Sequence, residues 1–295
     1  FQVQPVSGKT KGLWLDLNHS ILTINPKHHF SIWKNDQEVH RQKISSTGNA
    51  EFKRKENEPL SLMELSNDFW LSKTEITHQQ YHAVTGQELN DDESAKLPIQ
   101  VNWQEAKKFG DILTKKNPLP KGFSWRLPTE AEWEYACRAG SKGPYHLTGK
   151  STLEPNPLHH QKFLASFAWF KSNSNNQIQK VGQKKPNAWG FFDMHGNVAE
   201  WCLDAISYNK MEWVSNRKPK QINPLGKIGS TRIIRGGGFD SSFDECRAAY
   251  RDARDPHLEK NKFGFRIAVG RNQGVKVSNQ KANIIDQVVQ GLDGQ

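Results

Sequence analysis

The stretch "GGGFDSSFDECRAAYRDARD", residues 236–255, holds the residues best suited to chemistry. It contains three consecutive glycines, the cysteine Cys246, and the arginines Arg247, Arg251 and Arg254. A cysteine thiolate is a nucleophile and a ligand for soft metal ions, whereas a buried, protonated cysteine behaves as a small apolar residue. The arginines alternate with aspartates. This pattern favours ion pairs that fix a loop, and it also suits a cleft for an anionic or peptide ligand.

The composition describes a folded chain without a dedicated nucleic-acid or membrane-spanning segment. The 295 residues carry a formal net charge of +10, but the basic residues are spread out in short clusters such as "EFKRKENE". We therefore expect no specific nucleic-acid binding. Apolar runs are too short to span a membrane, so we expect no transmembrane segment. Ten tryptophans favour an irregular, loop-heavy aromatic core.

The cysteine count leaves the redox compartment open. Three cysteines allow either one disulfide with one free thiol, or three free thiols. The chain begins with Phe1 rather than Met, which favours a processed or trimmed product.

The elements that must position the loop fall into three segments. Residues 1–58 predict short strands joined by turns, because Leu13, Leu15 and Leu17 alternate with polar residues before turn signals. A charged stretch then leads into residues 59–272, and residues 273–295 are a polar tail. We treat these three ranges as an N-terminal β-rich extension, a main domain and a C-terminal tail.

The main domain contains three capping boxes, in which a Ser, Thr or Asn side chain and a Glu or Gln three residues later bond each other's backbone N–H groups. Long ordered loops are expected after Gly140, and strands at "TRIIRGG" and "FGFRIAVG". The predicted caps and their partners are Thr77 with Gln80, Asn102 with Glu105, and Thr129 with Glu132.

Six blocks, read in order, resemble one family. They are "FWLSKTEITHQQYHAVTG", "PIQVNWQEAKKFGDIL", "WRLPTEAEWEYACRAG", "PNAWGFFDMHGNVAEWCLD", "RIIRGGGFDSSFDECRAAYRDARDP" and "FGFRIA". Between about residues 60 and 270 the chain is similar to the formylglycine-generating enzyme, or sulfatase-modifying factor, family. The resemblance implies an α+β fold of the loop-rich, C-type-lectin-like kind.

The resemblance also tests the chemistry. Catalytic members of the family oxidise a substrate cysteine with two cysteines that bind copper, in the segment after a double glycine. Aligned on the glycines, the second cysteine falls on Cys246 and the first on Ser241. A neutral hydroxyl is a poor Cu(I) ligand, so the resemblance disfavours a copper site and formylglycine formation. The resemblance leaves Cys246 as a buried thiol, as half of a Cys202–Cys246 disulfide, or as a redox or metal residue.

A second implied site is a calcium loop in "DMHGNVAE". The resemblance assigns as ligands the side chains of Asp193 and Glu200 and main-chain carbonyls near Gly196 and Val198. Carboxylates and carbonyls are the hard oxygens that Ca²⁺ prefers. The alternative is that the two carboxylates only bond backbone amides.

Three function classes follow. The missing thiol favours a non-catalytic module that binds a protein or glycan partner. The alternatives are a metal-dependent oxidase or maturation enzyme using Cys246, and a structural component of an envelope or secretion assembly. The family and the absent Met favour a periplasmic or secreted location.

Overall fold

The computed structural model describes residues 21–24, 63–65, 67, 69–89, 94–141, 143–146, 157–207, 221–258 and 262–271. The strand predicted at Leu13 to Leu17 and the tail 273–295 lie outside these residues. Within them, no helix is long and apolar enough to cross a membrane.

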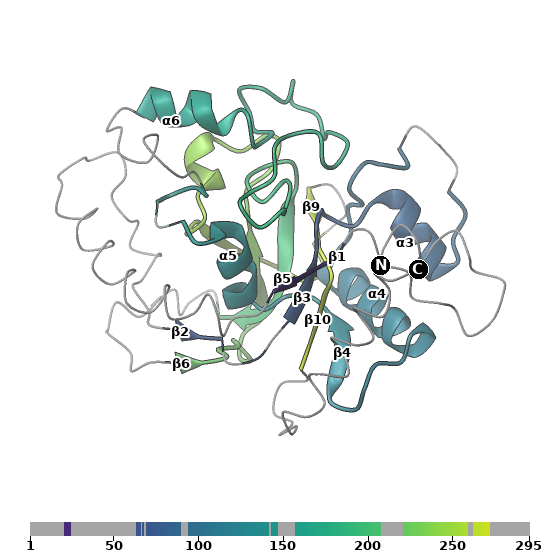
Figure 1. Ribbon diagram of the computed structural model, residues 1–295. Helices are drawn as coiled ribbons and strands as arrows, with labels where there is room; N and C mark the ends of the chain where they lie inside the picture. The colour runs from purple at the N-terminus through teal and green to yellow at the C-terminus, as the bar shows by residue number, and fades with distance from the viewer. Residues whose placement is uncertain are drawn as a thin grey trace, which may run out of the picture.

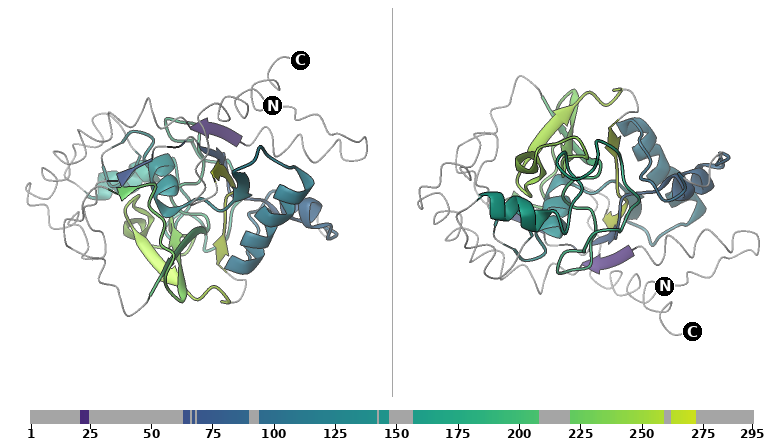
Figure 2. Two further views of the ribbon diagram at one scale, coloured as in Figure 1. Left: turned by 90° about the horizontal axis from the view of Figure 1, so that it is seen from below. Right: turned by 90° about the horizontal axis from the view of Figure 1, so that it is seen from above.

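The helices begin where the capping boxes predict. Helices α3 (His78–Thr85), α4 (Trp103–Lys116) and α5 (Glu130–Arg138) each have a complete reciprocal box. In α4, for example, the Glu105 N–H donates to Asn102 Oδ1 at 2.9 Å, and the Asn102 N–H donates to Glu105 Oε2 at 3.1 Å. The three predicted helix starts are therefore confirmed. A fourth helix, α6 (Pro157–Leu164), lies on the opposite side of the molecule from α3 and α4 (Figure 2).

One four-stranded antiparallel sheet joins the two ends of the described chain. Its order is β1 (Ile21–Ile24), β3 (Phe69–Ser72), β10 (Ala268–Arg271) and β4 (Phe123–Arg126). Strand β1 belongs to the predicted N-terminal extension, and it pairs Thr23 with Trp70 of β3. The extension thus contributes an edge strand to the sheet of the main domain, and α4 packs against β4 at the other edge (Figure 1).

A second four-stranded sheet carries the loop with Cys246. Its order is β8 (Arg251–Arg254), β7 (Thr231–Arg235), β5 (Ala199–Ile206) and β9 (Phe263–Gly264), and α5 packs on β5 and β7. The 3₁₀ helix η4 (Phe243–Cys246) lies between β7 and β8. Two short parallel strands, β2 (Met63–Glu64) and β6 (Gln221–Ile222), form a separate pair.

The sequence predicts one strand at the alternating run "FGFRIAVG", and this prediction is wrong. The run is divided between β9 in one sheet and β10 in the other. The residues in between, Phe265 and Ile267, are fully buried in the largest hydrophobic cluster. The crossing between the two sheets therefore uses the apolar residues that the alternation detects.

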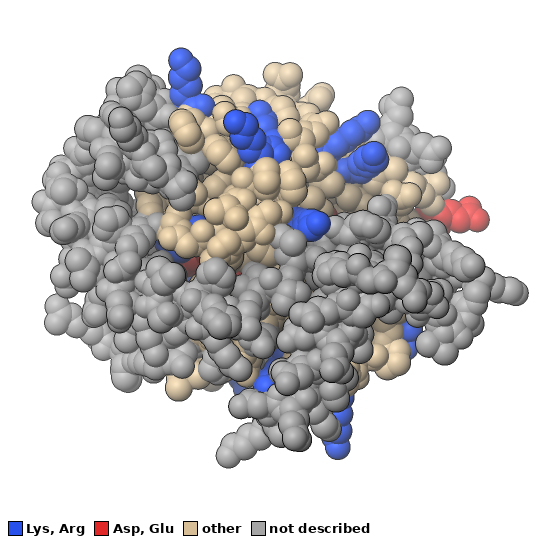
Figure 3. All heavy atoms as spheres, in the orientation of Figure 1, with Lys and Arg blue, Asp and Glu red and all other residues tan. Residues whose placement is uncertain are grey.

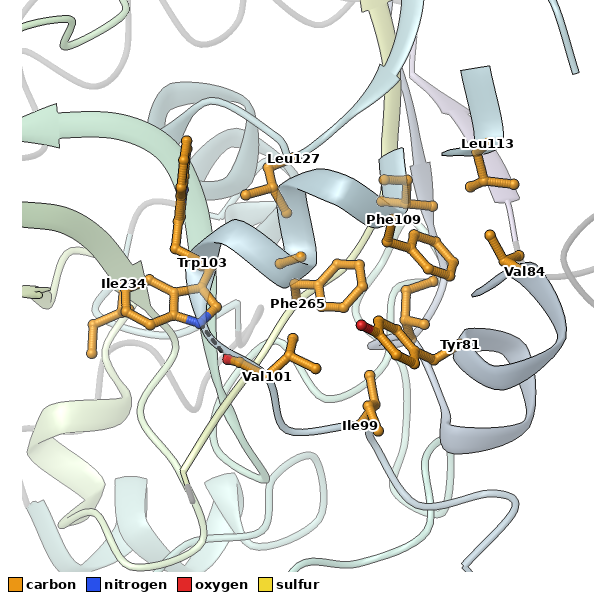
Figure 4. Packing of buried hydrophobic residues seen from close by; sticks show 14 of the residues in the cluster. Tyr81, Val84, Ile99, Val101, Trp103, Phe109, Leu113, Leu127, Ile234 and Phe265 are labelled. Carbon is orange, nitrogen blue, oxygen red and sulfur yellow. Dashed lines mark hydrogen bonds between the residues drawn. The ribbon is translucent and has the colours of Figure 1, made fainter. Parts of the chain in front are cut away.

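Aromatic packing links the helices to both sheets (Figure 4). The rings of Tyr81 and Phe109 stack with centroids 5.6 Å apart, and the Phe109 ring meets the Phe265 ring edge-on at 5.2 Å. Trp201 of β5 donates its indole N–H to the Val101 carbonyl at 2.9 Å. Between α6 and β5, residues 165–198 contain neither helix nor strand. The observed architecture is the loop-rich α+β arrangement that the sequence predicts.

Candidate functional site

The double glycine after β7 makes a turn that glycine alone tolerates. Gly236 and Gly237 have φ angles of +95° and +70°, a region that side chains rarely adopt. A Cβ atom on Gly237 would lie 2.9 Å from Cys246 Sγ and 3.0 Å from the Glu245 carbonyl oxygen. The glycine thus lets the chain pass directly against Cys246.

The next four residues form a tight turn around Ser241. The Gly238 N–H donates to Ser241 Oγ at 3.0 Å, and the Ser241 N–H donates to the Gly238 carbonyl at 3.0 Å. The Phe239 N–H donates to the Asn197 carbonyl at 2.7 Å, which ties this turn to residues 193–200. The Ser241 hydroxyl is used by the turn itself, as a local acceptor.

A cavity of about 550 Å³ opens between this turn and the second sheet. Its apolar lining includes Ile234 and Phe263 from the strands, and charged groups line it from both the strands and the loops. Such a mixture suits a ligand that has both polar and apolar groups, as a polypeptide segment does. The lining residues are Ala199, Ile234, Arg235, Gly237, Gly238, Asp240, Ser241, Glu245, Tyr250, Asp252, Arg254, Leu258, Lys262 and Phe263.

Four of the charged residues that line the cavity form two ion pairs. Lys262 Nζ contacts Asp240 Oδ2 at 2.6 Å, and Arg254 forms an ion pair with Asp252. Both pairs are partly exposed, so water and salt weaken them and a ligand can exchange for them at little cost.

Of the three arginines expected to line a cleft, Arg254 lines this cavity. Arg251 instead forms a two-point ion pair with Glu130 at the start of α5. Arg247 is buried, and its Nε lies 3.0 Å from Asp244 Oδ1. Arg251 thus ties β8 to α5, and Arg247 forms an ion pair within the loop, which is the alternative interpretation of the alternating charges.

Cys246 is fully buried and is not among the cavity residues. Burial raises the pKa of its thiol, and the nearby charges of Glu245 and Asp240 raise that pKa further. A thiol with a raised pKa is a poor nucleophile and a poor metal ligand at neutral pH. Of the two positions that the resemblance assigns to the copper site, Ser241 lines the cavity and Cys246 does not.

The Cys202–Cys246 disulfide is absent from the structure. Cys137, Cys202 and Cys246 are all free, buried thiols. Cys202 packs in β5 with Trp133 and Ile233, whereas Cys246 packs in a separate cluster with Tyr145. The two cysteines belong to neighbouring blocks of sequence but to different parts of the core.

Two carboxylates, Asp193 in the segment 193–200 and Glu75 from the segment before α3, have unused oxygens. Asp193 Oδ2 accepts from the Gly182 N–H at 2.7 Å, and Glu75 Oε1 accepts from Asn197 Nδ2 at 3.1 Å. Asp193 Oδ1 and Glu75 Oε2 are buried and have no hydrogen-bond partner. Burial raises the pKa of Asp193 to about 6. Burial, and then the charge of Asp193, raise the pKa of Glu75 well above its usual value.

Glu200, by contrast, is fully used. Both its oxygens accept from the Arg266 guanidinium at 2.7 Å, and Oε2 also accepts from the Trp133 indole N–H at 2.7 Å. Within the described residues, His, Cys, Asp and Glu side chains form no metal-ligating group of three or more. A calcium ion here would therefore need backbone carbonyls beside Asp193 and Glu75.

Sequence reasoning missed Glu75 and most of the cavity. Glu75 lies in the first of the family blocks, between Thr74 and the buried Ile76, and its mostly polar neighbours give no signal that its carboxylate is buried. The cavity residues Ala199, Asp252 and Phe263 come from three separate strands, β5, β8 and β9. Their spacing in the sequence carries no sign that they converge.

The family profile of the sulfatase-modifying factor enzyme 1-like domain matches residues 33–271, about four-fifths of the chain. The chain belongs to the sulfatase-modifying factor family. The match begins at residue 33, inside the segment 1–58 and after strand β1. The mixed fold with its long loops is accordingly the C-type-lectin-like fold of this family.

The relatives of this sulfatase-modifying factor domain differ in their names and in how much of them it spans. It is 25% identical over 253 residues to the chaperone protein LppX of Paenibacillus barcinonensis, covering 73% of this chain and 81% of that protein. It is 32% identical over 180 residues to the serine/threonine-protein kinase pkn1 of Chlamydia pneumoniae, covering 60% and 25%. It is 28% identical over 176 residues to the formylglycine-generating enzyme of Streptomyces coelicolor, covering 58% and 51%.

The chain thus spans a quarter of the kinase and half of the formylglycine-generating enzyme. Among solved structures, Treponema denticola variable protein 1 superposes with a TM-score of 0.57 at 26% identity, covering 68% of this chain and 84% of that one. The family and the fold are common to relatives with several different names. Function must therefore be argued from the site.

Proposed function

We propose that this sulfatase-modifying factor domain is a non-catalytic module that binds a polypeptide partner in the cavity beside Ser241. The observation that carries the proposal is that a serine lines the cavity while the thiol beside it is buried. Ser241 lines the cavity, whereas Cys246 is buried behind Gly237 with a raised pKa. A two-thiolate copper site needs two accessible, ionisable sulfurs, and this loop supplies none.

The cavity supports a polypeptide ligand through its mixed lining. Ile234 and Phe263 supply an apolar floor, and the exchangeable Asp240–Lys262 pair supplies donors and acceptors at the rim. The similarity to a protein named as a chaperone, over most of that protein's length, agrees with a polypeptide partner.

We also propose that calcium stabilises the loop on which this turn rests. The free oxygens of Asp193 and Glu75 would hold the ion together with carbonyls near Gly196 and Val198. Two buried carboxylates with raised pKa values are the kind of donor pair that a hard cation satisfies. Because the Phe239 N–H bonds the Asn197 carbonyl, order in the calcium loop would pass to the Ser241 turn.

Two measurements on the purified chain test the proposed function. In the first, a peptide library is selected on the wild-type protein and counter-selected on Ser241→Trp, whose side chain would fill the cavity. Peptides that bind the wild type and not this variant support the module. Lys107→Trp, at an exposed position on α4, controls for a general effect of the added indole.

In the second, the protein is loaded with Cu(I) and incubated with a cysteine-containing peptide and oxygen. Conversion of the peptide thiol to an aldehyde, lost in Cys246→Ala, would replace the binding module with the oxidase alternative. We expect that the protein does not take up Cu(I) in the presence of a competing chelator.

A further inference from the structure

The surface formed by α6 and the segment after it is unusually basic. Residues 161–192 contain five lysines and no arginine, aspartate or glutamate, although the chain as a whole has 31 acidic residues. In Figure 3, basic side chains project from the upper part of the molecule, over α6 and the loops that follow it, and no acidic side chain lies among them in the part of the chain that the structure describes. The sequence spacing alone gave no reason to group these lysines.

Hydrogen bonds bring three parts of this segment together. Gln161 Nε2 of α6 donates to Ser172 Oγ at 3.1 Å, and the Lys185 N–H donates to the Ser166 carbonyl at 3.0 Å. Lys162, Lys171 and Lys185 are consequently neighbours around the end of α6, and all three side chains are exposed. We call these three lysines, with Phe163, the lysine face.

The side-chain ammonium groups of the lysine face take no part in ion pairs among the described residues, whereas the ammonium group of their neighbour Lys184 is packed against the fold. Lys184, next to them, donates to the Ala165 carbonyl at 2.7 Å and lies 3.7 Å from the centre of the Trp169 ring. Within the described part of the chain, no ion pair involves Lys162, Lys171 or Lys185. Three uncompensated charges of one sign on one face produce an attractive field for an anionic partner.

An apolar side chain stands among these charges. Phe163 is 45% exposed and stacks on Phe167 with ring centroids 6.0 Å apart. An exposed aromatic ring flanked by lysines matches the interface of an anionic bilayer, where the ring enters the headgroup region and the ammonium groups stay at the lipid phosphates. Nucleic acids and sulfated polymers are typically gripped by arginine, whose fork contacts two oxygens, and residues 161–192 have none.

We propose that the lysine face docks the domain on an anionic lipid surface. This role is separate from peptide binding in the cavity, but docking would orient the cavity relative to the lipid surface. The Lys171 N–H donates to the Ser241 carbonyl at 2.9 Å, and Ser174 Oγ donates to the Phe239 carbonyl at 2.7 Å. The segment that carries the face therefore supports the rim of the cavity, and docking would hold that rim near the headgroups.

The test is sedimentation with vesicles of phosphatidylcholine, with and without one-third phosphatidylglycerol. We expect binding to the anionic vesicles only, weakening as salt is raised. The triple variant K162Q/K171Q/K185Q should bind about 100-fold more weakly, since each lysine near the surface is worth about fivefold. The control K107Q/K108Q/K115Q removes the same charge from exposed positions on α4 and should bind as the wild type does.

Phe163→Ser separates the two components of the face. It should weaken binding to anionic vesicles by about tenfold while leaving the salt dependence in place. Equal effects of the two lysine triples, or equal binding to neutral vesicles, would overturn the proposal. So would tighter binding to duplex DNA or heparin that is insensitive to Phe163→Ser, which would indicate a polyanion instead. Peptide binding in the cavity is measured independently, so either proposal can fail alone.

Discussion

Gly237 and Cys246 are packed so closely that a Cβ atom on Gly237 would lie 2.9 Å from the cysteine Sγ. The contact closes one side of the thiol with backbone, and the left-handed φ of +70° at Gly237 holds that backbone in place. Because the thiol is buried on its other sides by Tyr145 and Phe170, it has no path to the cavity that opens next to it. The loop therefore shapes the cavity, although its thiol cannot react there.

The first prediction concerns this contact. Gly237→Ala should destabilise the fold by about 2–4 kcal/mol, from the strained φ and the overpacking together. Cys246→Ala should cost only about 1–2 kcal/mol, through a small cavity. The double variant should lose less stability than the sum of the two single losses, because removal of Sγ relieves part of the clash. Urea unfolding measures all three, and strict additivity would show that the contact is not tight.

The second prediction concerns thiol access. All three cysteines should resist a thiol reagent in the folded protein and react fully after denaturation, because each is buried and burial raises each pKa. Mass mapping after alkylation without reductant identifies the modified positions. Rapid native labelling at Cys246, with Cys137 and Cys202 protected, would instead support the oxidase alternative.

The third prediction concerns calcium. Addition of Ca²⁺ should raise the Tm of the wild-type domain, and the gain should disappear in Glu75→Gln and Asp193→Asn. Calorimetric titration should give one site in the wild type and none in these variants. Glu130→Gln is a poor control because it breaks an ion pair, so Asp111→Asn on the exposed face of α4 is preferred. Unchanged calcium binding in both carboxylate variants would remove the proposed site.

The fourth prediction follows from the same carboxylates without calcium. The pKa of Asp193 is raised to about 6 in the folded state, so folding favours its protonated form. Its contribution to stability is complete below the unfolded pKa and is lost as pH rises through 6. In chelator, the wild type should therefore gain about 2–3 kcal/mol relative to Asp193→Asn between pH 7 and pH 4. Denaturant titrations of both proteins across this range give the difference, and parallel curves would contradict the raised pKa.

The capping boxes show how far the sequence carries. Thr77, Asn102 and Thr129 place three helices because each box is a local interaction between residues three positions apart. The division of "FGFRIAVG" could not be anticipated in that way. Alternation identifies residues that face a core, but which sheet each half joins depends on distant partners, Ala199 for Phe263 and Arg126 for Ala268.

The site shows the same limit. The alignment on the glycines identified Ser241 in place of a thiol, and in the structure Ser241 lines the cavity. It could not reveal that Glu200 is bound by Arg266, because 66 residues separate them. Nor could it pair Glu75 with Asp193. These contacts exist only after the loops pack, and the loops carry no periodic pattern from which to infer them.

The last prediction concerns His146, which is buried with neither ring nitrogen hydrogen-bonded. Its ring stacks on His195 at 4.7 Å and meets Phe167 edge-on at 4.8 Å, an aromatic site. Burial, and then His195, lower the pKa of His146 to about 2, so the folded protein keeps it neutral. That neutrality costs nothing above pH 6.5 and grows as pH falls, reaching about 2 kcal/mol at pH 5.

His146→Phe should therefore stabilise the domain, and more at pH 5 than at pH 8. Phenylalanine fills a similar volume and leaves no buried polar atom unpaired, so a gain of about 1 kcal/mol is expected even at pH 8. His195, whose pKa is lowered to about 4, stacks on this position in both proteins, so the difference also contains any effect of the new ring on His195. Urea midpoints of the two proteins at both pH values provide the measurement. A variant less stable at pH 5 would mean that His146 gains a hydrogen-bonding partner in solution.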